Sequence, residues 1–178
     1  MVNLNIVPVF KILAVISATI FKILVVIVTI FILLIGGWIF HANSRIHSAE
    51  ENHVRIKRFA RSAFETCSAG ASGVKMMTRK GSGSEQVLRP CSGPESTSRF
   101  FAKYIAEHFT ATGCTNPYGG QSCAVAGSNR GTSLGQAHLW GSKIGSDRDD
   151  LFIVTTVSDH DLLDPVAIPL RFSRITRE

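Results

Sequence analysis

The first forty residues are almost continuously apolar, and one stretch within them is long enough to cross a membrane. Residues 23–40 read ILVVIVTIFILLIGGWIF, eighteen positions without a charged side chain. A helix needs about 20 mostly apolar residues to span the hydrocarbon core of a bilayer. The pattern therefore predicts a transmembrane helix over residues 23–40, preceded by a cytoplasmic or interfacial segment over residues 1–22.

The pattern changes after residue 40 to that of an amphipathic helix. Residues 41–67 contain no Gly or Pro. Apolar or small side chains and one histidine recur there at steps of three and four, namely Ile46, Ala49, His53, Ile56, Ala60, Ala63 and Cys67. Gly70 and Gly73 then mark the end of the helix. We expect one helix to continue from the membrane through residues 41–69 and to lay its apolar side on a sheet.

Residues 70–178 have the pattern of a small head. Short strands are predicted at residues 74–78 and 86–89 around a Gly-Ser turn, and at 138–144, 151–158 and 166–172, with a loop region over 113–136. A second helix is predicted over residues 99–110, with N-cap candidates at 96–98. In the last strand Val166, Ile168, Leu170 and Phe172 alternate with other residues, which predicts that they pack against the core. Pro169 cannot donate a backbone hydrogen bond, so this strand is an edge or presents that position away from its neighbour.

These elements predict an α+β fold. A long N-terminal hydrophobic helix, half transmembrane and half amphipathic, packs on a small antiparallel sheet. The expected organisation is residues 1–22 as the N-terminal segment, 23–40 as the span, 41–69 as the amphipathic continuation and 70–178 as the globular head.

Charge is distributed unevenly along the chain, whose formal net charge is +6. Residues 1–61 carry seven Lys or Arg against two Glu, whereas residues 62–178 carry twelve against eleven acids. The excess positive charge thus lies beside the apolar segment and the head is nearly neutral, which favours membrane lipid over nucleic acid as a partner.

All four cysteines lie in the C-terminal part, at Cys67, Cys91, Cys114 and Cys123. An even number of cysteines in a small, loop-rich domain is typical of disulfides and of an oxidising compartment, and their spacing matches no zinc motif. Three connectivities are possible, of which pairing of neighbours closes the shortest loops. The disulfides favour an extracytoplasmic head, whereas the basic residues after the span favour a cytoplasmic one by the positive-inside rule.

A cleaved signal peptide is the competing interpretation of the apolar segment. Its apolar core is normally shorter and is followed by a small-x-small cleavage site. Here the run ends in Trp38-Ile39-Phe40 and the sequence that follows offers only a weak site. We therefore expect the segment to be retained as an anchor.

No sequence motif indicates catalysis or a cofactor. His41, His47 and His53 are expected to be solvated or interfacial, and His108 to be a core histidine with a hydrogen bond. Two acidic runs are expected to be solvated loops, namely Asp147-Asp149-Asp150 and Asp159-His160-Asp161 with Asp164. The alternative is that the carboxylates and imidazole of the second run bind a cation. Nucleophile-elbow, phosphate-loop and HExxH motifs do not occur in the sequence. We expect no enzymatic activity, metal or cofactor.

The order of these parts resembles the type IV pilins and the pilin-like pseudopilins. In the head the resemblance covers Cys67-Ser68-Ala69-Gly70, the strand pair that ends at Cys91-Ser92, the second helix, and Asn116-Pro117-Tyr118 before the C-terminal strands. It implies that the four cysteines are structural. It also implies that the apolar helix forms the packed centre of a filament, through positions that include Ile23, Val26, Ile30, Leu33, Leu34, Trp38 and Phe40.

The N-terminus departs from the pattern of that family. Pilin precursors have a short basic leader that ends in Gly and, shortly after it, a Glu, whereas here the first glycine is Gly36 and no acid precedes Glu50. The resemblance therefore implies a divergent subunit, anchored in the bacterial cytoplasmic membrane with an extracytoplasmic head. Its expected partners are copies of itself or related pilins, and the pilus or secretion machinery. The alternative is a bitopic membrane protein whose head binds a partner and which does not polymerise.

Overall fold

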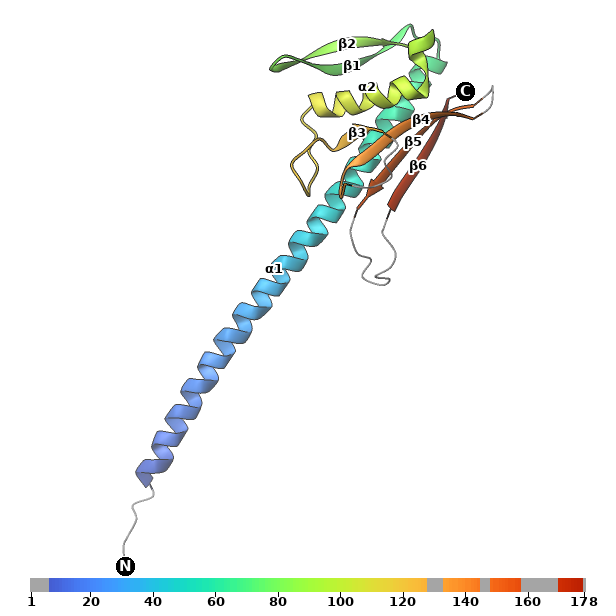
Figure 1. Ribbon diagram of the computed structural model, residues 1–178. Helices are drawn as coiled ribbons and strands as arrows, with labels where there is room; N and C mark the ends of the chain where they lie inside the picture. Colours follow the sequence, from blue (N-terminus) through green and yellow to red (C-terminus); the bar gives the residue numbers. More distant parts are fainter. Residues whose placement is uncertain (1–6, 128–132, 145–147, 158–169, 178) are drawn as a thin grey trace, which may run out of the picture. The chain divides into compact units, whose positions relative to one another are not determined.

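The computed structural model describes residues 7–127, 133–144, 148–157 and 170–177. The chain divides into two compact units between Asn43 and Ser44. Helix α1 (Val7–Ser68) contributes its first part to the first unit and its second part to the second (Figure 1).

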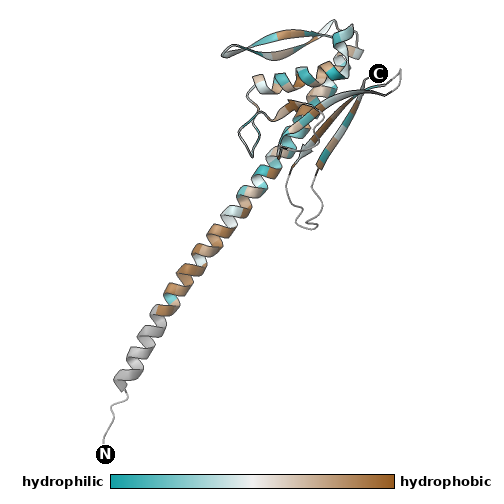
Figure 2. Cartoon of the chain, in the orientation of Figure 1, coloured by the Kyte–Doolittle hydropathy of each residue, from teal (hydrophilic) through white to brown (hydrophobic). Residues whose placement is uncertain are grey.

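The first unit is a helix with an apolar surface. Residues 23–35 are aliphatic apart from Thr29 and Phe31, and they contain no Gly or Pro to interrupt the backbone hydrogen bonds. Figure 2 shows this stretch in brown, the colour of hydrophobic residues. Among the described residues, Ile20–Ser68 is the one helical stretch long and apolar enough to cross a membrane, and none of its apolar window is buried.

The second unit contains the second part of α1 and two sheets. Its further elements are β1 (Gly73–Lys80), β2 (Gly83–Pro90), the 3-10 turn η1 (Pro94–Ser96), α2 (Ser98–Ala111), β3 (Ala124–Ala126), β4 (Ala137–Ile144), β5 (Arg148–Thr156) and β6 (Leu170–Arg177). Strands β1 and β2 form an antiparallel hairpin. The second sheet has the order β3-β4-β5-β6, in which only the β3–β4 pair is parallel. The predicted α+β fold, a long apolar helix with a small sheet, is confirmed.

The core of the second unit lies where α1, α2 and the four-stranded sheet meet. Helix α2 contacts the hairpin through β1 and the other sheet through β3 and β4 (Figure 1). The predicted stripe on α1 is confirmed, because Ala49, His53, Ile56, Ala60 and Ala63 are buried. These residues share the core with others from α2 and the strands, among them Phe64, Met76, Phe101, Ile105, Leu139, Leu151 and Ile153.

Helix α1 ends where the sequence predicts. Gly70 has a φ of +85°, a left-handed conformation that glycine adopts without a steric cost, and its N–H bonds to the carbonyl of Cys67. The turn brings the chain directly into β1. The hairpin strands are longer than predicted, since β1 extends to Lys80 and β2 begins at Gly83.

The predicted orientation of the last strand is wrong. Leu170 and Phe172 are exposed, and Ser173 and Ile175 are buried instead. The register explains this difference, because Ile175 pairs with Leu151 and Ser173 with Ile153, both of which face the core from β5. Ser173 tolerates burial because its hydroxyl has a hydrogen-bond partner, described below. Residues 166–169, the other part of the predicted strand, lie outside the described residues.

Strand β3 lies within residues 113–136, for which the sequence predicted only a loop. It is three residues long, too short to show a period-two pattern. Its parallel pairing with β4 gives the four-stranded sheet its first strand.

Candidate functional site

The apolar surface of α1 is the candidate functional site. The residues expected to mediate assembly, Ile23, Val26, Ile30, Leu33, Leu34, Trp38 and Phe40, are between 50% and 76% exposed. The neighbouring large apolar side chains from Ile20 to Phe40 are exposed as well. Such a surface is unfavourable in water, since burying apolar area contributes about 25 cal/mol per Å². It is therefore suited to lipid or to another apolar helix.

The hydroxyl group of this stretch, that of Thr29, is satisfied within the helix. The hydroxyl of Thr29 donates to the carbonyl of Val25 at 2.8 Å. This bond removes the cost of placing a free hydroxyl in hydrocarbon. Gly36 and Gly37 leave open space, because a Cβ added at either would meet nothing within 4 Å. Small residues of this kind let a second helix approach closely.

Two disulfides hold the second unit, and they join neighbouring cysteines. Cys67 in the last turn of α1 bonds to Cys91, the residue after β2, with Cα atoms 5.1 Å apart. Cys114 bonds to Cys123 across a sequence separation of 9. Neighbour pairing, one of the three connectivities open to the sequence, is thus the one found.

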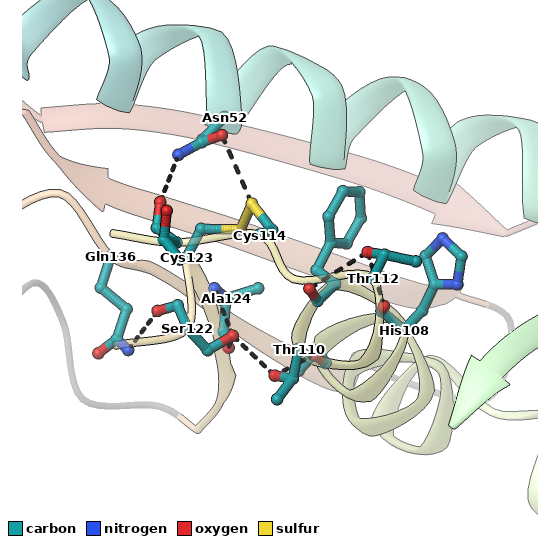
Figure 3. Close-up of a disulfide and its surroundings, with 12 residues drawn as sticks. Asn52, His108, Thr110, Thr112, Cys114, Ser122, Cys123, Ala124 and Gln136 are labelled. Carbon is teal, nitrogen blue, oxygen red and sulfur yellow. Dashed lines mark hydrogen bonds between the residues drawn. A yellow bond between two sulfur atoms is a disulfide. The ribbon is translucent and has the colours of Figure 1, made fainter. Parts of the chain in front are cut away.

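The second disulfide lies against α1 (Figure 3). The side-chain amide of Asn52 donates to the carbonyl of Thr115 at 3.2 Å, and its oxygen lies 3.5 Å from Sγ of Cys114. A disulfide sulfur carries no proton, so the second interaction is a contact only. Ser122, beside Cys123, pairs with the hydroxyl of Thr110 at 2.6 Å. The Cys114–Cys123 loop is therefore fastened to both helices.

His53 is buried between α1 and the sheet, so the expectation that it is solvated is wrong. Its Nδ1 lies 2.9 Å from the hydroxyl of Thr155 on β5, and its Nε2 lies 2.9 Å from the hydroxyl of Ser173 on β6. Burial lowers the pKa of His53 to about 4, and the charges of Lys57 and Arg171 add to this effect. The sequence indicated that His53 is buried, because His53 lies on the apolar stripe of α1.

His108 is a half-buried histidine that supports the hairpin, in agreement with the prediction. Its ring stacks on Phe59 with centroids 4.2 Å apart, and its Nδ1 accepts a hydrogen bond from the backbone N–H of Met77 at 3.0 Å. Burial, with a smaller effect of Arg55, lowers the pKa of His108. His41 and His47 are exposed on α1, as expected.

Asp149 and Asp150 belong to β5, so their prediction as solvated loop residues is wrong. Asp149 accepts hydrogen bonds from the backbone N–H and the hydroxyl of Ser98, and it thereby caps the first turn of α2. Asp150 is fully buried and accepts a hydrogen bond from Arg174 at 2.6 Å. The local sequence gave no sign of either partner, since both lie in distant elements. Asp147 and the run from Asp159 to Asp164 lie outside the described residues.

The Asn116-Pro117-Tyr118 sequence forms a turn that ties two loops to the sheet. Asn116 accepts a hydrogen bond from the N–H of Tyr118 at 3.0 Å and donates to the carbonyl of Leu134 at 2.8 Å. The hydroxyl of Tyr118 donates to the carbonyl of Val157 at 2.7 Å. These contacts are structural.

Within the described part of the chain, no group of three or more His, Cys, Asp or Glu side chains is placed to hold a metal ion. No protein-family model, curated protein or solved structure matches the chain.

Proposed function

We propose that the chain is a structural subunit of a type IV pilus-like filament or pseudopilus. In this proposal the apolar part of α1 first anchors the protein in the bacterial cytoplasmic membrane. It then packs against the same helix of other copies, with the head directed outward. The observation that carries the proposal is the apolar surface from Ile20 to Phe40, which no described residue of the chain buries.

A filament requires contacts between helices in addition to a membrane anchor, and two features of the helix support such contacts. The apolar surface surrounds the helix on all sides, so it has a face for each of several neighbours. Gly36 and Gly37 provide a place where two helix backbones can approach. The order of elements, a long helix followed by a disulfide-bonded α+β head, is the order in the pilins that the sequence resembles.

We place the head outside the cytoplasm. Two disulfides involve all four cysteines, and disulfides persist in oxidising compartments. The basic residues Arg55, Lys57, Arg58 and Arg61 argue for the opposite orientation by the positive-inside rule. Arg45, five residues beyond Phe40, argues for the same orientation. All five basic residues belong to the folded second unit, and the other four begin fifteen residues beyond Phe40, so we give the disulfides more weight.

The alternative is a membrane-anchored extracytoplasmic binding domain that does not polymerise. It uses the same helix only as a span. The two functions differ in whether α1 of one copy contacts α1 of another.

Cysteine cross-linking in membranes tests this difference, because the chain has no free thiol of its own. Single variants Val26→Cys, Ile30→Cys, Leu33→Cys and Leu34→Cys introduce one free thiol each, and Ser82→Cys in the exposed hairpin turn is the matched control. We expect oxidation to give dimers at some helix positions in a three-to-four-residue period, and sheared surface fractions to contain filaments by electron microscopy. Absence of helix dimers at every position, with no filaments, supports the alternative and overturns the proposal.

A further inference from the structure

A groove of about 320 Å³ lies on the second unit beside α2 and β4. It is lined by Arg99 and Lys103 of α2, by Ala126 and Gly127 at the end of β3, and by Trp140 and Gly141 of β4. It is separate from the apolar surface of α1.

The groove follows from the short length of β3. Strand β3 pairs with β4 only as far as Leu139, so in the described structure Trp140 and Gly141 have no strand beside them on that side. Helix α2 contacts β4 directly at this point, since a Cβ at Gly141 would lie 2.1 Å from the backbone nitrogen of Arg99. In the first turn of α2 the backbone N–H of Ser98 already donates to Asp149 at 2.7 Å.

The charge of the groove is positive. Arg99 and Lys103 are four residues apart on one face of α2, and both are exposed. In the described ranges neither makes an ion pair, and none of the six lining residues is acidic. Nζ of Lys103 lies 5.7 Å from the centre of the Phe100 ring, which helps to position it. Among the described residues the carboxylate of Asp149 lies at the first turn of α2, but it is bonded to Ser98. Arg99 and Lys103 keep no ion-pair partner there, and two adjacent cations of this kind favour an anionic group.

The third feature is a fixed aromatic ring. Trp140 stacks on Phe152 with ring centroids 5.5 Å apart and planes inclined by 18°. The stacking holds the indole in place, and Trp140 is one of the residues that line the groove.

We propose that this groove binds an acidic sugar, with its carboxylate on Arg99 and Lys103 and an apolar face of its ring against Trp140. The combination of a cation pair and one aromatic ring fits a ligand with an anionic group beside a ring. The volume is near the lower limit of about 300–1,000 Å³ for ligand pockets, which favours a single ring over a larger ligand. The extracytoplasmic location proposed above exposes the groove to surface polysaccharides. This binding activity goes beyond the proposed filament function and needs no assembly.

Tryptophan fluorescence tests the proposal on the full-length protein in detergent. The chain has two tryptophans, so a Trp38→Phe background leaves Trp140 as the reporter. The probes are methyl glucuronide and, as the neutral analogue, methyl glucoside. We expect a saturable change with the glucuronide and an affinity at least about tenfold lower for the glucoside, since the charge-assisted hydrogen bonds are then lost.

Variants identify the residues responsible. The double variant Arg99→Ala/Lys103→Ala is expected to weaken glucuronide binding by about tenfold or more. The matched control Lys75→Ala/Arg79→Ala removes two exposed cations, also four residues apart, from β1, and it is expected to bind as the parent does.

Three results overturn the proposal: no saturable change with the glucuronide, equal binding of the glucoside, or equal weakening by the control pair. Tighter competition by a short oligothymidylate than by an oligoglucuronide of the same charge also overturns it, because the groove is then part of a nucleic-acid surface. If the Arg99→Ala/Lys103→Ala variant does not fold, the comparison of the two sugars on the parent protein decides the question.

Discussion

Both parts of α1 are α-helical, but they differ in how far their large apolar side chains are exposed. Between Ile20 and Phe40 the large apolar side chains are exposed, whereas Ile56 and Phe64 in the second part are at most 3% exposed. The second part is amphipathic and finds its cover in α2 and the sheet. Residues 23–40 of the first part carry no charged side chain, and the described part of the chain does not bury them, so they are suited to cover by lipid or by another helix. A helix can therefore form along its whole length while its apolar side chains are buried by different partners in its two parts.

The largest predicted effect contrasts one phenylalanine in each part. Phe64→Ala is expected to lower the free energy of unfolding of the head by about 3–5 kcal/mol, because it leaves a cavity beside Phe101, whose ring centroid is 5.2 Å away. Phe31→Ala, at a side chain 63% exposed, is the matched control and is expected to leave head stability within about 0.5 kcal/mol. Urea unfolding in detergent, followed by Trp140 fluorescence in a Trp38→Phe background, measures both. A comparable loss from Phe31→Ala would show that the apolar part also supports the head.

The second prediction concerns the polar position in the buried stripe. The pKa of His53 is about 4 in the folded chain and about 6.5 when unfolded, so the unfolded state binds more protons between these values. Stability is therefore expected to be full above pH 6.5 and to fall on acidification towards pH 4, by about 3 kcal/mol from this residue. The cost arises because protonation places a charge in a buried site near Lys57 and Arg171.

Two variants isolate the contribution of His53. In His53→Gln the slope of stability against pH is expected to decrease over this window, whereas His47→Gln, at an exposed position of the same helix, is expected to keep the parental slope. Unfolding midpoints measured from pH 4 to pH 7 provide the test. Equal slopes in all three proteins would mean that other groups cause the pH dependence.

The smallest predicted effect concerns the exposed contact of α1 with the sheet. Arg171 on β6 forms an ion pair with Glu50 on α1, and both side chains are partly exposed, at 57% and 31%. Solvent screens such pairs, so Arg171→Ala is expected to cost less than about 1 kcal/mol. A loss as large as that of Phe64→Ala would contradict the view that apolar burial dominates the second part of the helix.

The sequence predicted those features that repeat along one element. The stripe Ala49-His53-Ile56-Ala60 recurs with the period of a helix, and it is buried as expected. The end of α1 two residues before Gly70 follows from the conformational freedom of that glycine. Helix α2 lies within one residue of its predicted bounds at each end.

Features that depend on contacts between distant residues were missed. Asp149 and Asp150 are acidic and flank a Gly-Ser turn, which is typical of a loop, but their partners Ser98 and Arg174 are 51 and 24 residues away. Likewise, the apolar alternation of the last strand predicted the wrong buried face, because pairing with β5 decides which face is turned inward. For the candidate site, the apolar segment was evident from composition, whereas the groove beside Trp140 depends on where β3 stops.

Strand β6 is the last described element of the second unit in the sequence, so the head can be completed only after β6 has been synthesised. Ser173 reaches back across 120 residues to His53, and Ile175 joins the same core. A chain emerging from the ribosome thus has α1 available for insertion long before its last strand exists. The final closure of the head must wait for synthesis to reach β6, so the formation of α1 and the folding of the head are separated in time by the topology of the sheet.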